Sequence, residues 1–417
     1  MRTDRENRDN LKKSAKLFYS TESDDIIIKN ENKMKKTNKL FYSEESNEEF
    51  DNIFAKRDRY VCKLVSENED DFKKDCPDFK YIPSILPAVE RIIVLGDVHG
   101  DFAVTIKMLK VANLIDADHD WIGGSTYVVQ VGDQVDRCRP QGTYPCNHEL
   151  GTENDEASDI KILKLFTKLH NQAILAGGKV ISLLGNHELM NSQGQLHYVS
   201  YLGLKEFDNY IDPKNKNLTF KNGEEARMHA FKPGNEYGKY LGCSRLGAVV
   251  VGSNLFVHAG ILPILIQELE IKNKEDIENI NLLIRKWLLK KINYRNIDKI
   301  VGSSKHSMFW TRILGNIPKN MHIHDQTCAD YLAPVLKTLN VGSVIIGHTP
   351  QSFIKFGGIN GTCDNKLWRV DNGSSGAFDK FDPEYLNSSD RHVADARKPQ
   401  VLEITNDSEF KVLVYND

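Results

Sequence analysis

Five short apolar runs along the chain are each followed by an Asp, Asn or His close to a glycine. They are Ile92–Leu95 before Gly96–Asp101, Tyr127–Val131 before Gly132–Arg137, Val180–Leu184 before Gly185–Glu188, Leu255–Val257 before His258, and Val344–Ile346 before Gly347–Pro350. Short apolar runs with such boundaries are typical of buried strands. Because open α/β sheets place their sites at the carboxyl ends of strands, the pattern predicts one site built from all of these strand ends.

Other segments show the periodicity of helices and hairpins. Asp159–Gln172 carries apolar residues on one helical face and predicts a crossover helix between the second and third strands. Asp276–Ile300 predicts a helix that packs on the core, with a wall over the site as the alternative role. Leu402–Thr405 and Phe410–Tyr415 flank a turn sequence and predict a closing hairpin. Lys205–Tyr240 is polar and rich in Asn, which predicts an irregular surface segment.

Composition changes markedly along the 417 residues. Residues 1–52 are charged and lack apolar periodicity, so we expect a disordered tail. This tail repeats Lys-Leu-Phe-Tyr-Ser at Lys16 and Lys39, either as a docking motif or as a gene-level duplication. Residues 53–87 form a transitional segment that could pack on the core. We expect the catalytic domain to span residues 88–417.

Charge and cysteine content narrow the possible classes of protein. The net charge of −3 gives no case for nucleic-acid binding, and the hydrophobic fraction of 40% supports a proper core. The 7 Cys are scattered and odd in number, which does not resemble a disulfide framework and favours a reducing compartment. A secretory signal, a transmembrane helix and a lipidation motif are not recognised. The expected location is intracellular, and cytoplasmic by default.

The polar residues at the strand ends form a complete set of metal ligands. They are Asp97, His99, Asp133, Asn186, His258 and His348. Asp97 and His99 lie on the same side of an extended strand end and can bind one ion together. The carboxylate of Asp133 can bridge two ions, with the remaining residues on the second. Imidazole, carboxylate and amide ligands without cysteine suit Mn, Fe or Zn, and two such ions can polarise a phosphoryl group.

These motifs resemble those of the metallophosphoesterase superfamily. Gly-Asn-His-Glu and Gly-Asp-Gln-Val-Asp-Arg are similar to the phosphoprotein phosphatase branch. Gly185–Asn191, together with Gln134, most resembles the bacterial-type, Shewanella-like phosphatases. The resemblance spans roughly Arg91 to Ser375. It implies a calcineurin-like fold: an α/β protein with a central β-sandwich of two mixed sheets flanked by helices.

The resemblance also implies a role for each residue. Asp97, His99 and Asp133 would hold one metal ion, and Asp133 would share the second with Asn186, His258 and His348. His187 would be the general acid and Asp136 would orient it. Arg137 and Arg312 would bind the phosphate, although the string Trp310-Thr-Arg312 could equally make a surface ion pair.

The implied function is a metal-dependent protein phosphatase that hydrolyses phosphomonoesters by direct attack of a metal-bridging hydroxide. Its substrate would be a phosphoprotein or phosphopeptide carrying phosphoserine or phosphothreonine, or phosphotyrosine. The alternative is a small-molecule or dinucleotide polyphosphate phosphohydrolase, but those relatives more often have Asp in place of Glu188. An alternative of another class is a catalytically silent scaffold that binds partners through the tail.

One position departs from the family pattern. Glycine usually follows the Asp-Arg pair, whereas here Cys138 follows Arg137. Cys138 and Cys146 bracket a loop beside the expected site. A reversible disulfide that shifts Arg137 is one hypothesis, and two free thiols are the favoured alternative in a reducing compartment. Asp371 could line the rim of the site or form a turn.

Overall fold

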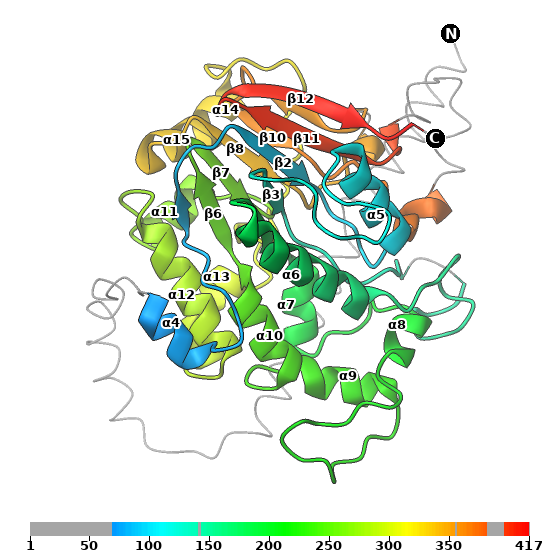
Figure 1. Ribbon diagram of the computed structural model, residues 1–417. Helices are drawn as coiled ribbons and strands as arrows, with labels where there is room; N and C mark the ends of the chain where they lie inside the picture. Colours follow the sequence, from blue (N-terminus) through cyan, green and yellow to red (C-terminus); the bar gives the residue numbers. More distant parts are fainter. Residues whose placement is uncertain (1–68, 141–142, 355–356, 382–395, 417) are drawn as a thin grey trace. The chain divides into compact units, whose positions relative to one another are not determined.

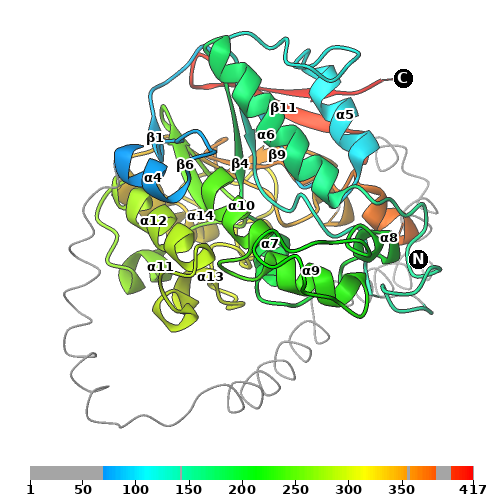
Figure 2. The same ribbon diagram turned by 60° about the horizontal axis from the view of Figure 1, so that its bottom comes forward.

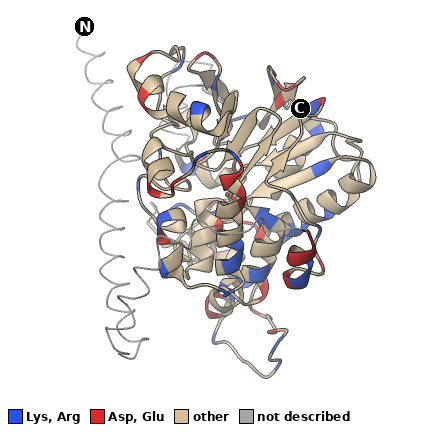
Figure 3. Ribbon diagram, turned by 90° about the vertical axis from the view of Figure 1, so that its left-hand side faces the viewer, with Lys and Arg blue, Asp and Glu red and all other residues tan. Residues whose placement is uncertain are grey.

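The structure is a computed structural model that describes residues 69–140, 143–354, 357–381 and 396–416 (Figure 1). All of these residues lie in the compact unit Ser66–Asp417. The charged tail, its two repeats and Cys62 lie outside the described residues. Charges of both signs are mixed over the helices seen in Figure 3. Among the described residues, no helix is long and apolar enough to cross a membrane.

Two mixed sheets form the centre of this unit. In spatial order, the first contains β1 (Ile85–Leu86), β6 (Ala248–Val251), β7 (Asn254–Val257), β8 (Ser343–Ile346), β10 (Leu367–Arg369) and β9 (Asn360–Thr362). The second contains β12 (Glu409–Val414), β11 (Gln400–Thr405), β2 (Arg91–Leu95), β3 (Tyr127–Gln130), β4 (Lys179–Leu183) and β5 (Arg245–Leu246). The predicted β-sandwich of two mixed sheets is therefore confirmed.

Alternation along the strands explains why two sheets pack together. In β2, Ile92 and Val94 pack in the cluster shared with the first sheet, which includes Phe256 of β7. Their neighbours Ile93 and Leu95 pack in a second cluster, with helices on the outer face. Because successive strand side chains point to opposite faces, each apolar run builds both layers of core.

The helices cover the outer faces of the two sheets. They are α4 (Glu69–Asp75), α5 (Phe102–Val111), α6 (Asp159–Leu175), α7 (Asn186–Ser192), α8 (Tyr201–Lys205), α9 (Gly223–Phe231), α10 (Glu236–Ser244), α11 (Pro263–Glu268), α12 (Asp276–Leu288), α13 (Asp298–Val301), α14 (Gln326–Tyr331) and α15 (Ala333–Leu339). Three 3-10 helices are η2 (Tyr294–Asn296), η3 (Gln351–Ile354) and η4 (Gly376–Phe381). Helices α5 and α6 lie over the sheet that contains β2 and β3 (Figure 1).

The structure contains the expected crossover helix, as α6, and the expected hairpin, as β11 and β12. The segment from Asp276 packs in the core, as favoured, but its helix ends at Leu288. Lys290 has a φ of 60°, a left-handed conformation that stops the helix before the short elements η2 and α13.

The prediction that Lys205–Tyr240 is irregular is confirmed for residues 206–222, which contain no helix or strand, and is wrong for the rest. This segment contains α9 and the beginning of α10, and its apolar residues Phe207, Phe231 and Tyr237 are buried in the main core. Figure 2 shows these two helices beside α6 and α7. The many polar residues of the segment lie in its turns and obscured a short apolar face.

Six cysteines form three disulfides, which corrects the expectation of scattered free thiols. The pairs are Cys76–Cys243, Cys138–Cys146 and Cys328–Cys363, with sequence separations of 167, 8 and 35 residues. The favoured reading of Cys138 and Cys146 as free thiols is therefore wrong. Two of the three pairs join residues far apart in sequence, so the spacing of the cysteines could not show them.

We expect removal of the Cys76–Cys243 bond to cost more stability than removal of Cys328–Cys363. The first disulfide attaches the segment with α4 and β1 to α10 across 167 residues. In the chain-entropy model, a longer closed loop stabilises more, and we expect about 5 kcal/mol for the first bond and about 4 kcal/mol for the second. Urea unfolding of the two double Cys→Ala variants measures the difference. Equal losses would contradict the expectation.

Candidate active site

The carboxyl ends of the five predicted strands meet at one place. Strands β2, β3 and β4 are parallel neighbours in one sheet, and β7 and β8 are parallel neighbours in the other. Glycines allow the loops to approach each other closely. A Cβ on Gly185 would lie 2.1 Å from Asp133 Oδ1, and a Cβ on Gly347 would lie 2.2 Å from Asp97 Oδ1. The glycines beside the ligands are therefore required by the packing of the site.

Several residues of the site adopt the left-handed backbone conformation. The φ angles are 41° at His99, 54° at Asp133, 75° at Asp136 and 65° at His348. This region disfavours residues other than glycine, and such strain tends to gather at functional sites. Each of these residues follows the end of its strand, so the turned backbone directs several side chains toward one place.

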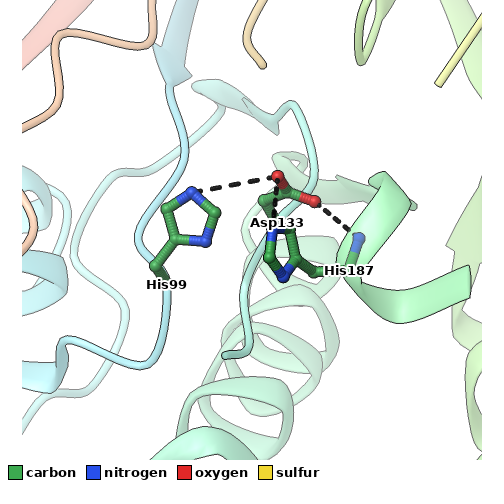
Figure 4. A group of neighbouring side chains, drawn as sticks. All are labelled: His99, Asp133 and His187. Atoms are coloured by element: carbon green, nitrogen blue, oxygen red, sulfur yellow. Dashed lines mark hydrogen bonds and ion pairs between the residues drawn. The ribbon is translucent and has the colours of Figure 1, made fainter. Parts of the chain in front are cut away.

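Asp133 lies at the centre of the buried cluster. Its Oδ2 lies 3.8 Å from His99 Nε2, 3.9 Å from His187 Nε2 and 3.4 Å from His258 Nε2. Its Oδ1 accepts a hydrogen bond from the backbone N–H of His187 at 3.0 Å. Figure 4 shows the side chains of His99, Asp133 and His187 converging. A carboxylate with three imidazoles around one oxygen is suited to binding between two cations.

The remaining predicted ligands lie on both sides of Asp133. His258 Nε2 lies 2.9 Å from Asn186 Oδ1, and His258 and His348 are in ring contact, with centroids 5.0 Å apart. On the other side, His99 Nε2 lies 3.9 Å from Asp97 Oδ2. Two groups have ligand atoms within 4.8 Å of one another, namely His99 with Asp133 and His187, and His258 with Asp133 and His348. The structure thus brings all six predicted ligands together.

The chemistry of this cluster fits bound metal ions. Among the described residues, Asp97 Oδ1 and His99 Nδ1 are buried and have no hydrogen-bond partner. Burial raises the pKa of Asp97 well above its usual range, and the nearby carboxylates of Asp371 and Asp133 raise it further. Buried carboxylates that destabilise each other's charged form need a cation, and a divalent or trivalent ion on these donors would supply it.

His187 and Asp136 form a hydrogen-bonded pair at the edge of the cluster. His187 Nδ1 lies 2.9 Å from Asp136 Oδ2, which leaves Nε2 facing Asp133. Asn191 Nδ2 donates to both carboxylate oxygens of Asp136, at 2.9 and 3.1 Å. Asp136 is fully buried, so these donors fix the ring orientation of His187 without competition from water.

The two arginines predicted to bind phosphate are placed differently. Arg312 is half-buried, and its Nη1 donates to the backbone oxygen of His348 at 2.9 Å, at the rim of the second ligand group. Arg137 is buried, and its Nη1 lies 3.1 Å from Asp101 Oδ2. Arg312 therefore borders the cluster, whereas Arg137 is bound in an ion pair with another residue.

A family comparison identifies the assembly of motifs. The family model of the calcineurin-like phosphoesterases matches residues 90–352, a range that includes all six predicted ligands. The chain belongs to the calcineurin-like phosphoesterase family. The cluster is therefore the candidate active site of this phosphoesterase.

Two relatives share much of the sequence of this phosphoesterase. It is 31% identical over 357 residues to Shewanella-like protein phosphatase 2 of Arabidopsis thaliana, covering 78% of each chain. It is 40% identical over 260 residues to the uncharacterised protein R398 of Acanthamoeba polyphaga mimivirus, covering 60% of this chain and 97% of that protein. The resemblance to Shewanella-like phosphatases, predicted from the motifs, is therefore confirmed.

The fold of the phosphoesterase is also found among solved structures. The crystal structure of a cold-active protein-tyrosine phosphatase from a psychrophilic Shewanella species matches with a TM-score of 0.54 and 21% identity. The match covers 80% of this chain and 82% of that chain. It supports the calcineurin-like arrangement of the two sheets.

Glu188 has a structural role in the phosphoesterase. Its carboxylate accepts hydrogen bonds from the backbone N–H groups of Gly185, Asp133 and Gln134, at 2.6, 3.0 and 2.7 Å. It therefore ties the loop after β4 to the loop after β3.

Asp371 is buried, and its carboxylate accepts a hydrogen bond from the Gly373 N–H at 2.9 Å, which forms the expected turn. Asp371 also lies beside the cluster, since a Cβ on Gly96, next to Asp97, would lie 3.0 Å from Asp371 Cα. Burial raises the pKa of Asp371 to about 6.

Sequence reasoning missed a buried arginine behind the His187–Asp136 pair. Arg227 of α9 is fully buried, with Nη2 at 2.7 Å from Asp159 Oδ2 and at 3.3 Å from Asp136 Oδ1. Its Nε donates to Asn191 Oδ1 at 2.8 Å. No motif surrounds Arg227, and it lies in the segment that the sequence presented as irregular surface. Only the fold reveals its contact with Asp136.

Proposed function

We propose that the chain is a metal-dependent protein phosphatase that hydrolyses phosphomonoesters of phosphoserine and phosphothreonine, with phosphotyrosine as the alternative. The observation that carries the proposal is the Asp133 carboxylate among the imidazoles, next to the oriented pair of His187 and Asp136. The similarity to a Shewanella-like protein phosphatase supports a protein substrate. Glu188 continues to weigh against a dinucleotide polyphosphate substrate.

Two metal ions per chain, of Mn, Fe or Zn, fit the donors. Asp97, His99 and Asp133 would hold the first, and Asp133, Asn186, His258 and His348 would hold the second. When bound, the ions supply Lewis-acid polarisation of the phosphoryl group and a water acidic enough to act as a nucleophile near neutral pH. Elemental analysis of the purified protein tests both number and identity.

The protein's own groups handle the proton and the phosphate. Asp136 accepts the hydrogen bond from Nδ1–H of His187 and keeps its Nε2 directed toward the cluster. His187 Nε2–H then donates a proton to the departing serine, threonine or tyrosine oxygen. The guanidinium of Arg312, beside His348, provides a positive charge and two parallel donors for the phosphate oxygens.

Turnover assays with the full chain test the proposal. Metal-dependent hydrolysis of p-nitrophenyl phosphate would exclude the silent scaffold. A panel of phosphoserine, phosphothreonine and phosphotyrosine peptides, compared with diadenosine polyphosphate, then identifies the substrate class. Faster turnover of the dinucleotide than of every peptide would reject the protein phosphatase proposal.

His187→Asn is expected to lower kcat on a phosphoserine peptide by about 10²–10⁴-fold, because a poor leaving group needs a proton from the acid. The decrease in kcat should be smaller with p-nitrophenyl phosphate, because the p-nitrophenolate leaving group is stable without a donated proton. Metal content should be unchanged. Since His187 also lies within reach of the first ligand group, a loss of metal in this variant would show that it is a ligand instead.

Location and partners beyond the substrate stay predictions. The three disulfides count against the cytoplasmic location, because disulfides persist in oxidising compartments. Labelling of free thiols in intact cells distinguishes the cytosol from an oxidising compartment, since labelled cysteines would favour the cytosol.

The prediction of a docking partner for residues 1–52 rests on the repeated Lys-Leu-Phe-Tyr-Ser. If deletion of the tail leaves turnover of a protein substrate unchanged, substrate docking is rejected.

A further inference from the structure

The guanidinium of Arg137 is already bound by carboxylates. Arg137 is 4% exposed, and Nη1 lies 3.1 Å from Asp101 Oδ2 and 3.6 Å from Glu156 Oε1. Its Nε donates to the backbone oxygen of Asn154 at 3.0 Å. Asp101 also caps α5 and accepts from the Gly376 N–H at 2.8 Å, so the ion pair is part of the fold. These contacts occupy Nε and Nη1 of Arg137, and among the described residues Nη2 makes no hydrogen bond.

Two residues further on, Arg139 lies beside the histidines of the cluster. Its guanidinium carbon is 4.5 Å from the ring centre of Phe378 and 5.8 Å from that of Tyr198. The same two rings pack on the cluster, Phe378 against His99 at 5.4 Å and Tyr198 against His187 at 5.0 Å between centroids. Arg139 therefore stands over two aromatic side chains that border the first ligand group.

The guanidinium of Arg139 keeps donors available. Nη1 donates to the backbone oxygens of Asp136 and Cys138, at 3.1 and 2.9 Å. Within the described ranges, Nη2 and Nε make no hydrogen bond and no carboxylate pairs with Arg139. Stacking on aromatic rings leaves the N–H edge of a guanidinium open to an anion.

The electrostatics of the cluster also include Arg139. Burial lowers the pKa of His99 well below its usual range, and the charge of Arg139 lowers it further. Burial lowers the pKa of Arg139 itself, against the opposite effect of Tyr198 and of the carboxylates of Asp133 and Asp136. The placement itself comes from the geometry, since Arg139 stacks on the two rings that contact His99 and His187.

The backbone of Arg139 is held on both sides. Cys138 is bonded to Cys146, and Lys380 Nζ donates to the backbone oxygen of Arg139. Pro140 follows and restricts the chain further. A fixed backbone limits the conformational entropy lost when the side chain binds a ligand.

We propose that Arg139 is a further arginine that binds the phosphate of the substrate, in addition to Arg137 and Arg312; the inference rests on the proposed phosphatase function. Through Phe378 and Tyr198, Arg139 adjoins the group with His99 and His187, and Arg312 adjoins His348. A phosphate at the centre of the cluster would have a guanidinium on each side.

Calorimetric titration of inorganic phosphate into the metal-loaded protein tests the inference. We expect Arg139→Gln to bind phosphate about 10²-fold more weakly, because charge-assisted hydrogen bonds are lost. Arg139→Lys, which keeps the charge but loses the fork, should be intermediate. Metal content and Tm should match the wild type. No difference in phosphate titration between the wild type and Arg139→Gln would overturn the inference.

Two further variants complete the experiment. Arg91→Gln removes an ion pair with Glu403 on the sheet, and it should leave phosphate affinity unchanged. Arg137→Gln should lower Tm by breaking its pair with Asp101, whereas Arg139 has no carboxylate partner among the described residues and Arg139→Gln should not lower Tm. The phosphate titration does not depend on turnover. A wild-type protein that binds phosphate but hydrolyses no phosphomonoester would therefore reject the phosphatase proposal without testing the role of Arg139.

Discussion

Asp133→Asn is expected to reduce turnover of p-nitrophenyl phosphate by at least about 10⁴-fold, because the site loses Lewis-acid stabilisation worth several kcal/mol. Oδ2 of Asp133 lies within 3.4–3.9 Å of the Nε2 atoms of three histidines. Asparagine has the same shape, and its oxygen can still accept from the His187 N–H. The substitution therefore removes the negative charge and one metal-binding oxygen while preserving the packing.

The test combines kinetics with elemental analysis. Metal content should fall by at least one ion per chain, and added metal should restore little activity. Asp212→Asn is the matched control, since Asp212 is another buried aspartate, hydrogen-bonded to His229 outside the site. Its metal content and turnover should stay close to the wild type. If Asp133→Asn keeps its metal and turns over within tenfold of the wild type, Asp133 does not bridge two ions.

The convergence of the candidate ligands could be predicted because each is encoded locally. Asp97, Asp133 and Asn186 directly follow the glycines at the ends of β2, β3 and β4, and the register places Leu95 beside Gln130. Parallel neighbours with aligned ends bring such residues together whatever the rest of the chain does. The two-sheet sandwich was implied by the resemblance of these motifs to the metallophosphoesterases, and the apolar runs are consistent with it, since buried strands need cover on both faces.

The missed features depend on contacts between distant segments. Cys76 pairs with Cys243 across 167 residues, and neither position carries a local signal for a partner. The ion pairs of Arg137 were missed for a related reason. Its motif implied a phosphate-binding arginine and gave no sign that Asp101 and Glu156 pair with its Nη1. Motifs specify residue types, whereas the surrounding side chains decide which of them remain available.

Arg227→Met is expected to lower the free energy of unfolding by about 3–5 kcal/mol, because removing one partner of a buried ion pair leaves uncompensated charge. Arg227 is fully buried between Asp136 and Asp159, with Glu206 Oε2 at 3.9 Å. Burial raises the pKa of Glu206 to about 8, so this group is largely neutral at pH 7. Methionine fills a similar volume, so the loss would arise from charge more than from packing.

The pH dependence distinguishes charge from packing. Burial raises the pKa of Asp159 in the folded protein, even with Arg227 beside it. Removing Arg227 raises that pKa further, so the variant folds with an added proton, and its stability declines as pH rises above the pKa of the unfolded carboxyl group. The deficit in urea unfolding should therefore grow from pH 5 to pH 8. Arg227→Met combined with Asp159→Asn should recover part of it, and a deficit that is independent of both pH and Asp159 would show that Arg227 acts through packing alone.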